Sequence, residues 1–128
     1  MKSFPVFERR VNFADTDLAG IVHFSNILRF IEEAEHAAMF SAGVAPVSNV
    51  GGFPKVHVKC DYRSPLKFGD VADILLEIVK MGEKSLSWNF KVYAGQRVVA
   101  EGTMVTVFVT SSGEGTVIPL GMREALES

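Results

Sequence analysis

The chain has 128 residues, of which 48% are hydrophobic and 22% are charged, and its 13 basic and 15 acidic side chains give a formal net charge of −2. This length and composition fit one globular domain over residues 1–128 and exclude a disordered chain, and the balanced charge without a run of Lys or Arg argues against a nucleic-acid partner. No apolar stretch approaches the ~20 residues of a membrane span and no signal-peptide segment opens the chain, so the cytoplasm is the expected location.

The first predicted element is a strand in the segment FERRVNF. Its period-two alternation puts Phe7, Val11 and Phe13 on one face, with Arg10 and Asn12 on the other. The strand leads into the run FADTDLAGIVHF, which holds the only Asp-x-Asp pair of the chain directly before its most apolar helix.

That helix is predicted from Phe24 to Ala42, with Gly43 just past its end as the C-cap. Residues at helical spacing form one apolar stripe: Phe24, Ile27, Ile31, Ala34 and Ala38. Three further apolar residues widen it: Phe30, Ala37 and Phe40. The helix is therefore expected to be buried over most of its circumference, and the other side is left to Arg29, Glu32, Glu33 and His36.

Four further strands are predicted after a loop rich in Gly, Val and Pro, and each has an alternating face. These faces consist of Val56, Val58, Cys60 and Tyr62 in the first strand, Ala72, Ile74, Leu76 and Ile78 in the second, Leu86, Trp88, Phe90 and Val92 in the third, and Val99, Thr103, Val105, Val107 and Val109 in the last. The connections MGEKS and YAGQR are short and contain Gly, which indicates antiparallel hairpins.

One long apolar helix combined with four meandering strands predicts an α+β fold. The largely antiparallel sheet is expected to curl around the single central helix and bury it. Residues 119–126 are expected to form a short last helix.

Cys60 is the only cysteine, so the chain has no internal disulfide. Its place in an alternating strand favours a buried thiol over a catalytic one, because no activating neighbour is evident nearby. The three histidines, His23, His36 and His57, lack the spacing of zinc sites, so no metal is expected.

The run FADTDLAGIVHFSNILRFIEEAE, followed after one loop by VKCDYRSPLKFGDVADI, resembles the hotdog-fold thioesterases of the 4-hydroxybenzoyl-CoA thioesterase and YbgC-like type. The opening pattern of that family is matched by Phe13, Asp15, Asp17, Gly20, Ile21, Val22 and Phe24. Its later Pro-x-x-x-Gly-Asp loop is matched by Pro65, Gly69 and Asp70. The resemblance covers nearly the whole chain and implies a hotdog fold and an acyl-CoA thioesterase that releases a free acid and coenzyme A.

The resemblance implies that Asp17 is the catalytic carboxylate and that a backbone N–H at the start of the helix, at Phe24 or Ser25, binds the thioester carbonyl. Thioester hydrolysis needs a group that activates water or attacks the carbonyl, and a donor where negative charge develops on oxygen. A carboxylate in a turn and the unpaired N–H groups of a helix N-terminus supply both, and Gly20 allows a sharp turn between them. Whether Asp17 acts as nucleophile or as general base stays open.

Three neighbouring residues have two interpretations each. His23 stands where many relatives carry an aromatic residue, so it either orders the site and binds the acyl group or simply packs. In the hydroxybenzoyl-CoA branch a carboxylate at the place of Glu32 contacts the acyl group, but an ion pair with Arg29 or His36 at helical spacing is favoured here. Asp15 is expected to be a turn or cap residue rather than a catalytic one.

Coenzyme A needs cationic or polar contacts for its phosphates. Four candidates line up near the first strand after the helix and the loop that follows it: Lys55, Lys59, Arg63 and Lys67. Surface cations of this kind are ordinarily solvated. Two interpretations therefore stay open for these four residues: solvated surface side chains, or contacts to the coenzyme A phosphates. Coenzyme A enters as part of the substrate, and no other cofactor is expected because no Gly-rich phosphate loop is present.

Two other functions stay open: a non-catalytic acyl-CoA binding protein, and a hotdog hydratase or dehydratase, which pairs an Asp with a His in a different context.

A sheet curled around one helix leaves free edge strands, and relatives join two such units with the active site between them. A homodimer or homotetramer is therefore expected. The length and aromatic or aliphatic nature of the acyl group are left open by the sequence.

Overall fold

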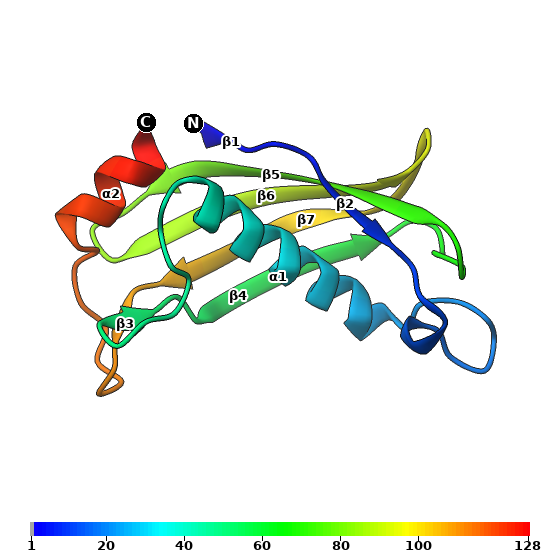
Figure 1. Ribbon diagram of the computed structural model, residues 1–128, viewed down its shortest axis with the longest axis horizontal. Coiled ribbons are helices and arrows are strands. Elements are labelled where there is room, and N and C mark those ends of the chain that lie inside the picture. The colour runs from blue at the N-terminus through cyan, green and yellow to red at the C-terminus, as the bar shows by residue number, and fades with distance from the viewer. Residues whose placement is uncertain (1) are drawn as a thin grey trace.

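A six-stranded antiparallel sheet and one long helix make up most of the molecule (Figure 1). The computed structural model describes residues 2–128. The sheet has the order β1 (Lys2–Ser3), β5 (Val71–Met81), β6 (Ser85–Ala94), β7 (Arg97–Val107) and β4 (Lys55–Tyr62), and β2 (Phe7–Arg10) also pairs with β5. A small second sheet joins β3 (Gly51–Gly52) to β8 (Val109–Thr110).

Three helical segments complete the fold: the 3-10 helix η1 (Phe13–Asp15), the long helix α1 (Phe24–Ser41) and the short C-terminal helix α2 (Leu120–Glu127). The predicted short last helix is thus confirmed. In Figure 1, α1 lies across one face of the sheet, and the two ends of the chain lie side by side near α2. Among residues 2–128, no helix has both the length and the apolar character needed to cross a membrane.

The strand order departs from the predicted meander at one point. Strands β5, β6 and β7 do follow one another as antiparallel hairpins, as the two short glycine-containing connections predict. Strand β4, however, pairs with β7 and not with β5. The loop over residues 63–70 therefore carries the chain from one edge of the sheet past β7 and β6 to β5.

Helix α1 buries the central part of its predicted stripe. Its buried residues are Ile27, Phe30, Ile31, Ala34, Glu35, Ala38 and Met39. Phe24 is 59% exposed, because it lies on the stripe but in the first turn, at the end of the helix. Phe40 is 65% exposed because it is two residues from Ala38, which puts it on the opposite side of the helix. Ala42 occupies the C-cap itself and Gly43 follows with φ +81°, so the predicted end of the helix is one residue too long.

The first predicted strand also ends early. Val11 is fully buried as predicted, but β2 stops at Arg10, and Phe13 belongs to η1 and is 77% exposed. The backbone N–H of Asn12 donates to Oδ2 of Asp15 at 2.8 Å, and the N–H of Asp15 donates to the Asn12 carbonyl at 3.0 Å. This local turn competes with further strand pairing and directs Phe13 into solvent.

A β-bulge changes the core face of β7. Val92 pairs with Ala100 and Tyr93 pairs with Val98, so Val99 is the extra residue. From this point the alternation is shifted by one. Ala100, Met104 and Thr106 are consequently buried, as is Phe108 just beyond the strand. The extra residue Val99 is also fully buried, as predicted. The prediction that Thr103, Val105, Val107 and Val109 face the core is wrong, whereas the alternating faces predicted for β5 and β6 are confirmed.

Strand β4 lies at the edge of the sheet, and its predicted apolar face is only partly covered. Val58, Cys60 and Tyr62 stand opposite Met104, Gly102 and Ala100 of β7, so they lie on the side of α1. Val58 and Tyr62 are nevertheless 40% and 42% exposed. Cys60 is half-buried, and this burial raises the pKa of its thiol, which agrees with a structural rather than a reactive cysteine.

Candidate active site

The Asp-x-Asp pair lies in a tight turn between η1 and α1. The N–H of Asp17 donates to the Ile21 carbonyl and the N–H of Gly20 donates to the Asp17 carbonyl, both at 2.9 Å. Gly20 has φ +79°, a left-handed conformation that favours glycine. Oδ1 of Asp17 accepts a 2.8 Å hydrogen bond from the N–H of Ala19. The other oxygen, Oδ2, accepts none from residues 2–128, and the side chain is exposed.

The turn is fixed to the rest of the molecule on both sides. Thr16 and Val22 bridge each other across it, and Ile21 forms a β-bridge with Lys67 in the loop over residues 63–70. The N–H of Val22 donates to the Leu66 carbonyl at 2.8 Å. The position of Asp17 therefore depends on a loop that is distant in the sequence.

His23 is the N-cap of α1. Its Nδ1 accepts a 3.3 Å hydrogen bond from the N–H of Ser25 and lies 2.8 Å from the Ser25 hydroxyl. The N–H of Ser25 is thus already occupied, whereas the N–H of Phe24 donates to no acceptor within residues 2–128. Of the two predicted oxyanion donors, only Phe24 is available in this conformation. His23 therefore caps the first turn of α1.

A cavity of about 410 Å³ lies at this end of α1. Its lining residues are Asp17, Ile21, Val22, His23, Phe24, Ile27, Tyr62, Arg63, Ser64 and Pro65. Four predicted site residues, Asp17, His23, Phe24 and Arg63, therefore surround one space, and Gly20 is in the turn behind it. Ser25, Glu32, Lys55, Lys59 and Lys67 do not line it.

Tyr62 is a cavity residue whose role the sequence analysis missed. Its hydroxyl donates to the Phe24 carbonyl at 3.2 Å, and its ring meets the Phe24 ring edge to face with centroids 5.9 Å apart. Burial, together with the neighbouring Cys60, raises the pKa of Tyr62 to about 12. Tyr62 is therefore a neutral hydroxyl that holds the first turn of α1. The only sequence signal for this role is an aromatic residue at the end of the strand expected to cover the helix.

Asp15 has the structural role that was expected. Its carboxylate accepts hydrogen bonds from Nη1 and Nη2 of Arg9 at 2.8 and 3.3 Å. Burial favours the protonated form, but the hydrogen bonds from Arg9 and from the Asn12 N–H prevail and lower the pKa of Asp15. Arg9 also binds Glu33 at 2.8 Å, so one guanidinium ties η1 to α1.

Glu32 and Lys55 belong to a second, smaller hollow beside α1. Nζ of Lys55 lies 3.2 Å from Oε2 of Glu32 and 2.5 Å from Oε1 of Glu35. The predicted pairing of Glu32 with Arg29 or His36 is therefore wrong, because β4 brings a lysine to the same helix face. This hollow has about 170 Å³ and is lined by Leu28, Arg29, Ile31, Glu32, Lys55, Val58, Phe90 and Met104.

The four cations predicted for coenzyme A do not form one patch. Lys55 is paired with two helix carboxylates. Lys59 stands opposite Thr103, on the sheet face away from α1. Arg63 lines the large cavity and pairs with Glu101 at 3.3 Å. Lys67 is exposed in the loop that binds the Asp17 turn. The alternation of β4 separates side chains that look clustered in the sequence.

Within residues 2–128, no group of three His, Cys, Asp or Glu side chains is arranged to hold a metal ion. The residues that line the cavity supply a carboxylate, a backbone donor with no acceptor among residues 2–128, aromatic rings and one arginine. These groups can activate water, or attack a carbonyl, beside a donor for an oxyanion.

Known proteins are similar to this chain in sequence and in fold. The model of the thioesterase superfamily matches residues 19–111. The chain is 30% identical over 140 residues to the 1,4-dihydroxy-2-naphthoyl-CoA hydrolase of Synechococcus sp. (strain CC9605), with 100% of this chain and 94% of that protein covered.

Two solved structures extend the comparison. A gentisyl-coenzyme A thioesterase has a TM-score of 0.87 and 30% identity, covering 95% of this chain and 99% of that one. A 1,4-dihydroxy-2-naphthoyl-CoA thioesterase from Synechocystis has a TM-score of 0.88 over 99% of this chain and 97% of that one. Its identity is 22%, so it bears on the fold alone.

Proposed function

The chain belongs to the thioesterase superfamily and hydrolyses acyl-CoA thioesters, and from this premise we propose that Asp17 and the backbone N–H of Phe24 carry out the reaction. One observation carries the proposal: the carboxylate and a donor without an internal acceptor line the same cavity. The fold is the hotdog fold of this superfamily. The site that we propose is the cavity at the N-terminal end of α1.

In the proposed reaction the thioester carbonyl oxygen accepts a hydrogen bond from the N–H of Phe24. Negative charge grows on this oxygen as the carbonyl carbon becomes tetrahedral, and the N-terminal end of α1 stabilises it. Collapse of the intermediate breaks the C–S bond and releases the coenzyme A thiolate. The products are the free acid and coenzyme A.

Asp17 has two chemically complete routes. As a general base it takes a proton from water while the resulting hydroxide adds to the carbonyl. As a nucleophile its carboxylate adds to the carbonyl and forms an anhydride, which water then hydrolyses. A single turnover in ¹⁸O-labelled water identifies the nucleophilic route if the free acid is unlabelled and Asp17 carries the label, because this happens only when an anhydride forms and water attacks its aspartyl carbon.

We propose that the substrate carries an aromatic acyl group. The rings of His23, Phe24 and Tyr62 line it together with aliphatic side chains, and aromatic rings pack well on one another. The names of two relatives, a 1,4-dihydroxy-2-naphthoyl-CoA hydrolase and a gentisyl-coenzyme A thioesterase, support the same class. We expect kcat/KM to be higher for hydroxyaryl-CoA than for straight-chain acyl-CoA of similar size.

For the coenzyme A phosphates we retain two of the four predicted cations. Arg63 lines the cavity, and Lys67 follows the cavity residue Pro65 in the adjoining loop. Lys55 is neutralised by two carboxylates, and Lys59 lies on the far face of the sheet. Replacing Arg63 or Lys67 by Ala should raise KM more than it lowers kcat.

The functional unit is proposed to be a homodimer or homotetramer. Strand β4 is an edge strand with unpaired backbone groups, and its residues Val56, Val58 and Tyr62 are exposed. Phe24 of α1, which contacts Tyr62, is exposed as well. A second copy of the chain would pair this edge and cover these apolar side chains.

The test is a thiol-release assay on a panel of aryl-, alkyl- and enoyl-CoA thioesters, with the wild-type protein and Asp17→Asn side by side. Release of thiol by the wild-type protein but not by the variant supports the proposal. Binding without release would favour the acyl-CoA binding protein. Loss of an enoyl double bond without thiol release would favour the hydratase.

A further inference from the structure

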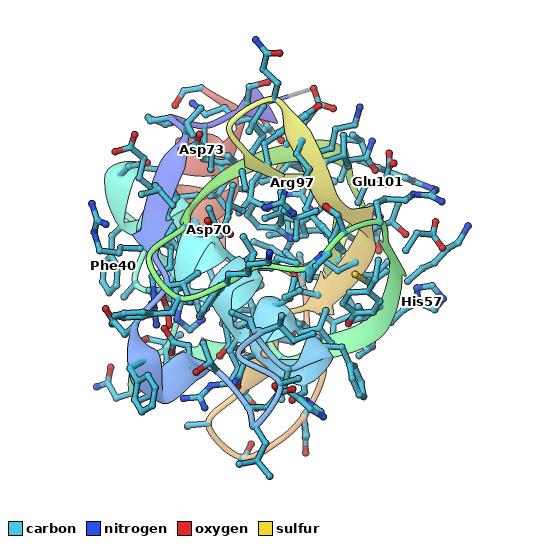
Figure 2. The ribbon with its side chains drawn as sticks, turned by 90° about the vertical axis from the view of Figure 1, so that its right-hand side faces the viewer. Phe40, His57, Asp70, Asp73, Arg97 and Glu101 are labelled. Carbon is cyan, nitrogen blue, oxygen red and sulfur yellow. The ribbon has the colours of Figure 1, made fainter. Side chains whose placement is uncertain are left out.

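Arg97, the first residue of β7, makes three contacts to one loop beside the candidate site. Nη1 donates to the Ser64 hydroxyl at 2.9 Å and to the Pro65 carbonyl, and Nη2 lies 3.3 Å from Oδ2 of Asp70. Figure 2, which faces this end of the molecule, shows Arg97 and Asp70 near its middle, below the turn between β6 and β7. A single guanidinium thus joins Ser64 and Pro65 to Asp70, near the two ends of the loop over residues 63–70.

The middle of this loop binds the catalytic turn. The Leu66 carbonyl accepts the N–H of Val22 at 2.8 Å, and Lys67 bridges Ile21. Ile21 in turn accepts the N–H of Asp17. Hydrogen bonds therefore join Arg97 to the loop, and the next residue of the loop to the turn that carries Asp17 and precedes Phe24.

We propose that Arg97 is a positioning residue for the hydrolysis, which acts by clamping the loop that holds Asp17 and the start of α1 in register. The inference rests on the proposed roles of Asp17 and Phe24. Arg97 does not line the cavity, so it acts through the loop and not on the substrate.

The guanidinium is suited to this role because it is planar and presents several donors in fixed directions. Asp70 supports the same geometry, since its Oδ2 also accepts the N–H of Lys67 at 2.9 Å. A lysine keeps the charge, but its compact ammonium group does not reproduce the fixed fork that joins Ser64, Pro65 and Asp70. Arg97→Lys should therefore behave more like Arg97→Ala than like the wild-type protein.

The fold does not depend on this clamp alone. The loop keeps a fully buried Leu66, and the backbone bonds of Ser64 to Val99 and of Val11 to Asp70 remain without Arg97. Arg97→Ala is therefore expected to fold, with the turn less firmly held. Displacement of a reacting group by about 1 Å can cost on the order of 100-fold in rate, so a fall in kcat of about 10- to 100-fold is expected with a much smaller change in KM.

The experiment compares Arg97→Ala and Arg97→Lys with Arg123→Ala as a matched control. Arg123 also donates to backbone carbonyls, those of Gly82 and Glu83, but at the turn between β5 and β6. We expect the control to lose thermal stability and keep its kcat. Millimolar guanidinium should restore part of the kcat of Arg97→Ala and have no such effect on Arg123→Ala.

Amide hydrogen exchange at Val22 gives a readout that is independent of activity. Faster exchange of Val22 in Arg97→Ala, together with the fall in kcat, supports the proposal. An unchanged kcat in Arg97→Ala overturns the proposal, whether or not Val22 exchange changes. An equal fall in the kcat of Arg123→Ala overturns it as well. Asp17→Asn tests the catalytic assignment separately. If this variant retains wild-type turnover, the proposed role of Asp17 is wrong, and Val22 exchange in Arg97→Ala still tests whether Arg97 holds the loop.

Discussion

Nζ of Lys55 on β4 lies 2.5 Å from Oε1 of Glu35 on α1, and the Glu35 side chain is only 1% exposed. Burial raises the pKa of Glu35 above the ordinary glutamate value of 4.5, although the hydrogen bond from Lys55 acts in the opposite direction. The folded protein therefore holds this proton more tightly than the unfolded chain.

This shift predicts a pH dependence of stability. The contribution of a group whose folded pKa is raised is present below the unfolded value and is lost as the pH rises through the folded value. The free energy of unfolding of the wild-type protein should therefore fall relative to that of Glu35→Gln as the pH rises above 4.5, which urea titrations at several pH values would measure. The control is Glu32→Gln, which replaces the exposed carboxylate that also pairs with Lys55. Parallel curves for wild-type and Glu35→Gln would contradict the prediction.

Asp17→Asn should abolish turnover and leave acyl-CoA binding largely intact. The amide keeps the shape of the turn, including an oxygen for the Ala19 N–H, but it can neither take up a proton effectively nor attack a carbonyl. Loss of a general base commonly costs about 10²- to 10⁴-fold in kcat, whereas KM should move much less. Steady-state kinetics on the best substrate provide the measurement.

Asp15→Asn is the matched control for this variant. It should lower the rate modestly, because it weakens the ion pair with Arg9 that supports the same loop. Retention by Asp17→Asn of more than about a tenth of the wild-type kcat would show that the catalytic carboxylate is elsewhere.

Ile31→Asp should unfold the protein. Ile31 is 1% exposed at the centre of the buried face of α1, where an unpaired carboxylate costs several kcal/mol, comparable with the whole stability of a domain. Thermal unfolding followed by circular dichroism would test this. Phe40→Asp, on the exposed side of the same helix, should melt close to the wild-type temperature. A cooperative wild-type-like melt for Ile31→Asp would mean that the core lies elsewhere.

Light scattering at micromolar concentration should detect an assembly larger than the 14.0 kDa chain. Val58→Asp changes a residue of edge strand β4 that lies on the side of α1 and is 40% exposed. It should shift the population toward monomer, because it puts a charge among apolar side chains that a second copy would cover. Glu101→Lys, on the neighbouring strand, is a surface control. A wild-type protein that scatters only as a monomer would exclude the shared interface.

The long helix and the faces of β5 and β6 could be predicted from the sequence because their signals are local. Ile27, Ile31 and Ala34 repeat at the helical period, and Leu86, Trp88 and Phe90 repeat at the strand period. The meeting of Asp17 and Phe24 at one cavity follows from the same cause, since only a short turn separates them. For β7 the alternation predicts the wrong core face beyond Val99, because the bulge at Val99 shifts the alternation by one residue. No unusual residue type marks this bulge in the sequence.

Contacts between distant segments were decided by the tertiary structure alone. The pairing of β4 with β7 brings Lys55 to Glu35 and Tyr62 to Phe24, and the crossing loop brings Arg97 to Asp70. Hydrophobic periodicity reports which side of an element is buried, but not which element lies opposite it. The sequence by itself therefore determined the elements and the turn that carries Asp17. Strand order determined which side chains support that turn, because only the packed sheet sets the distances between them.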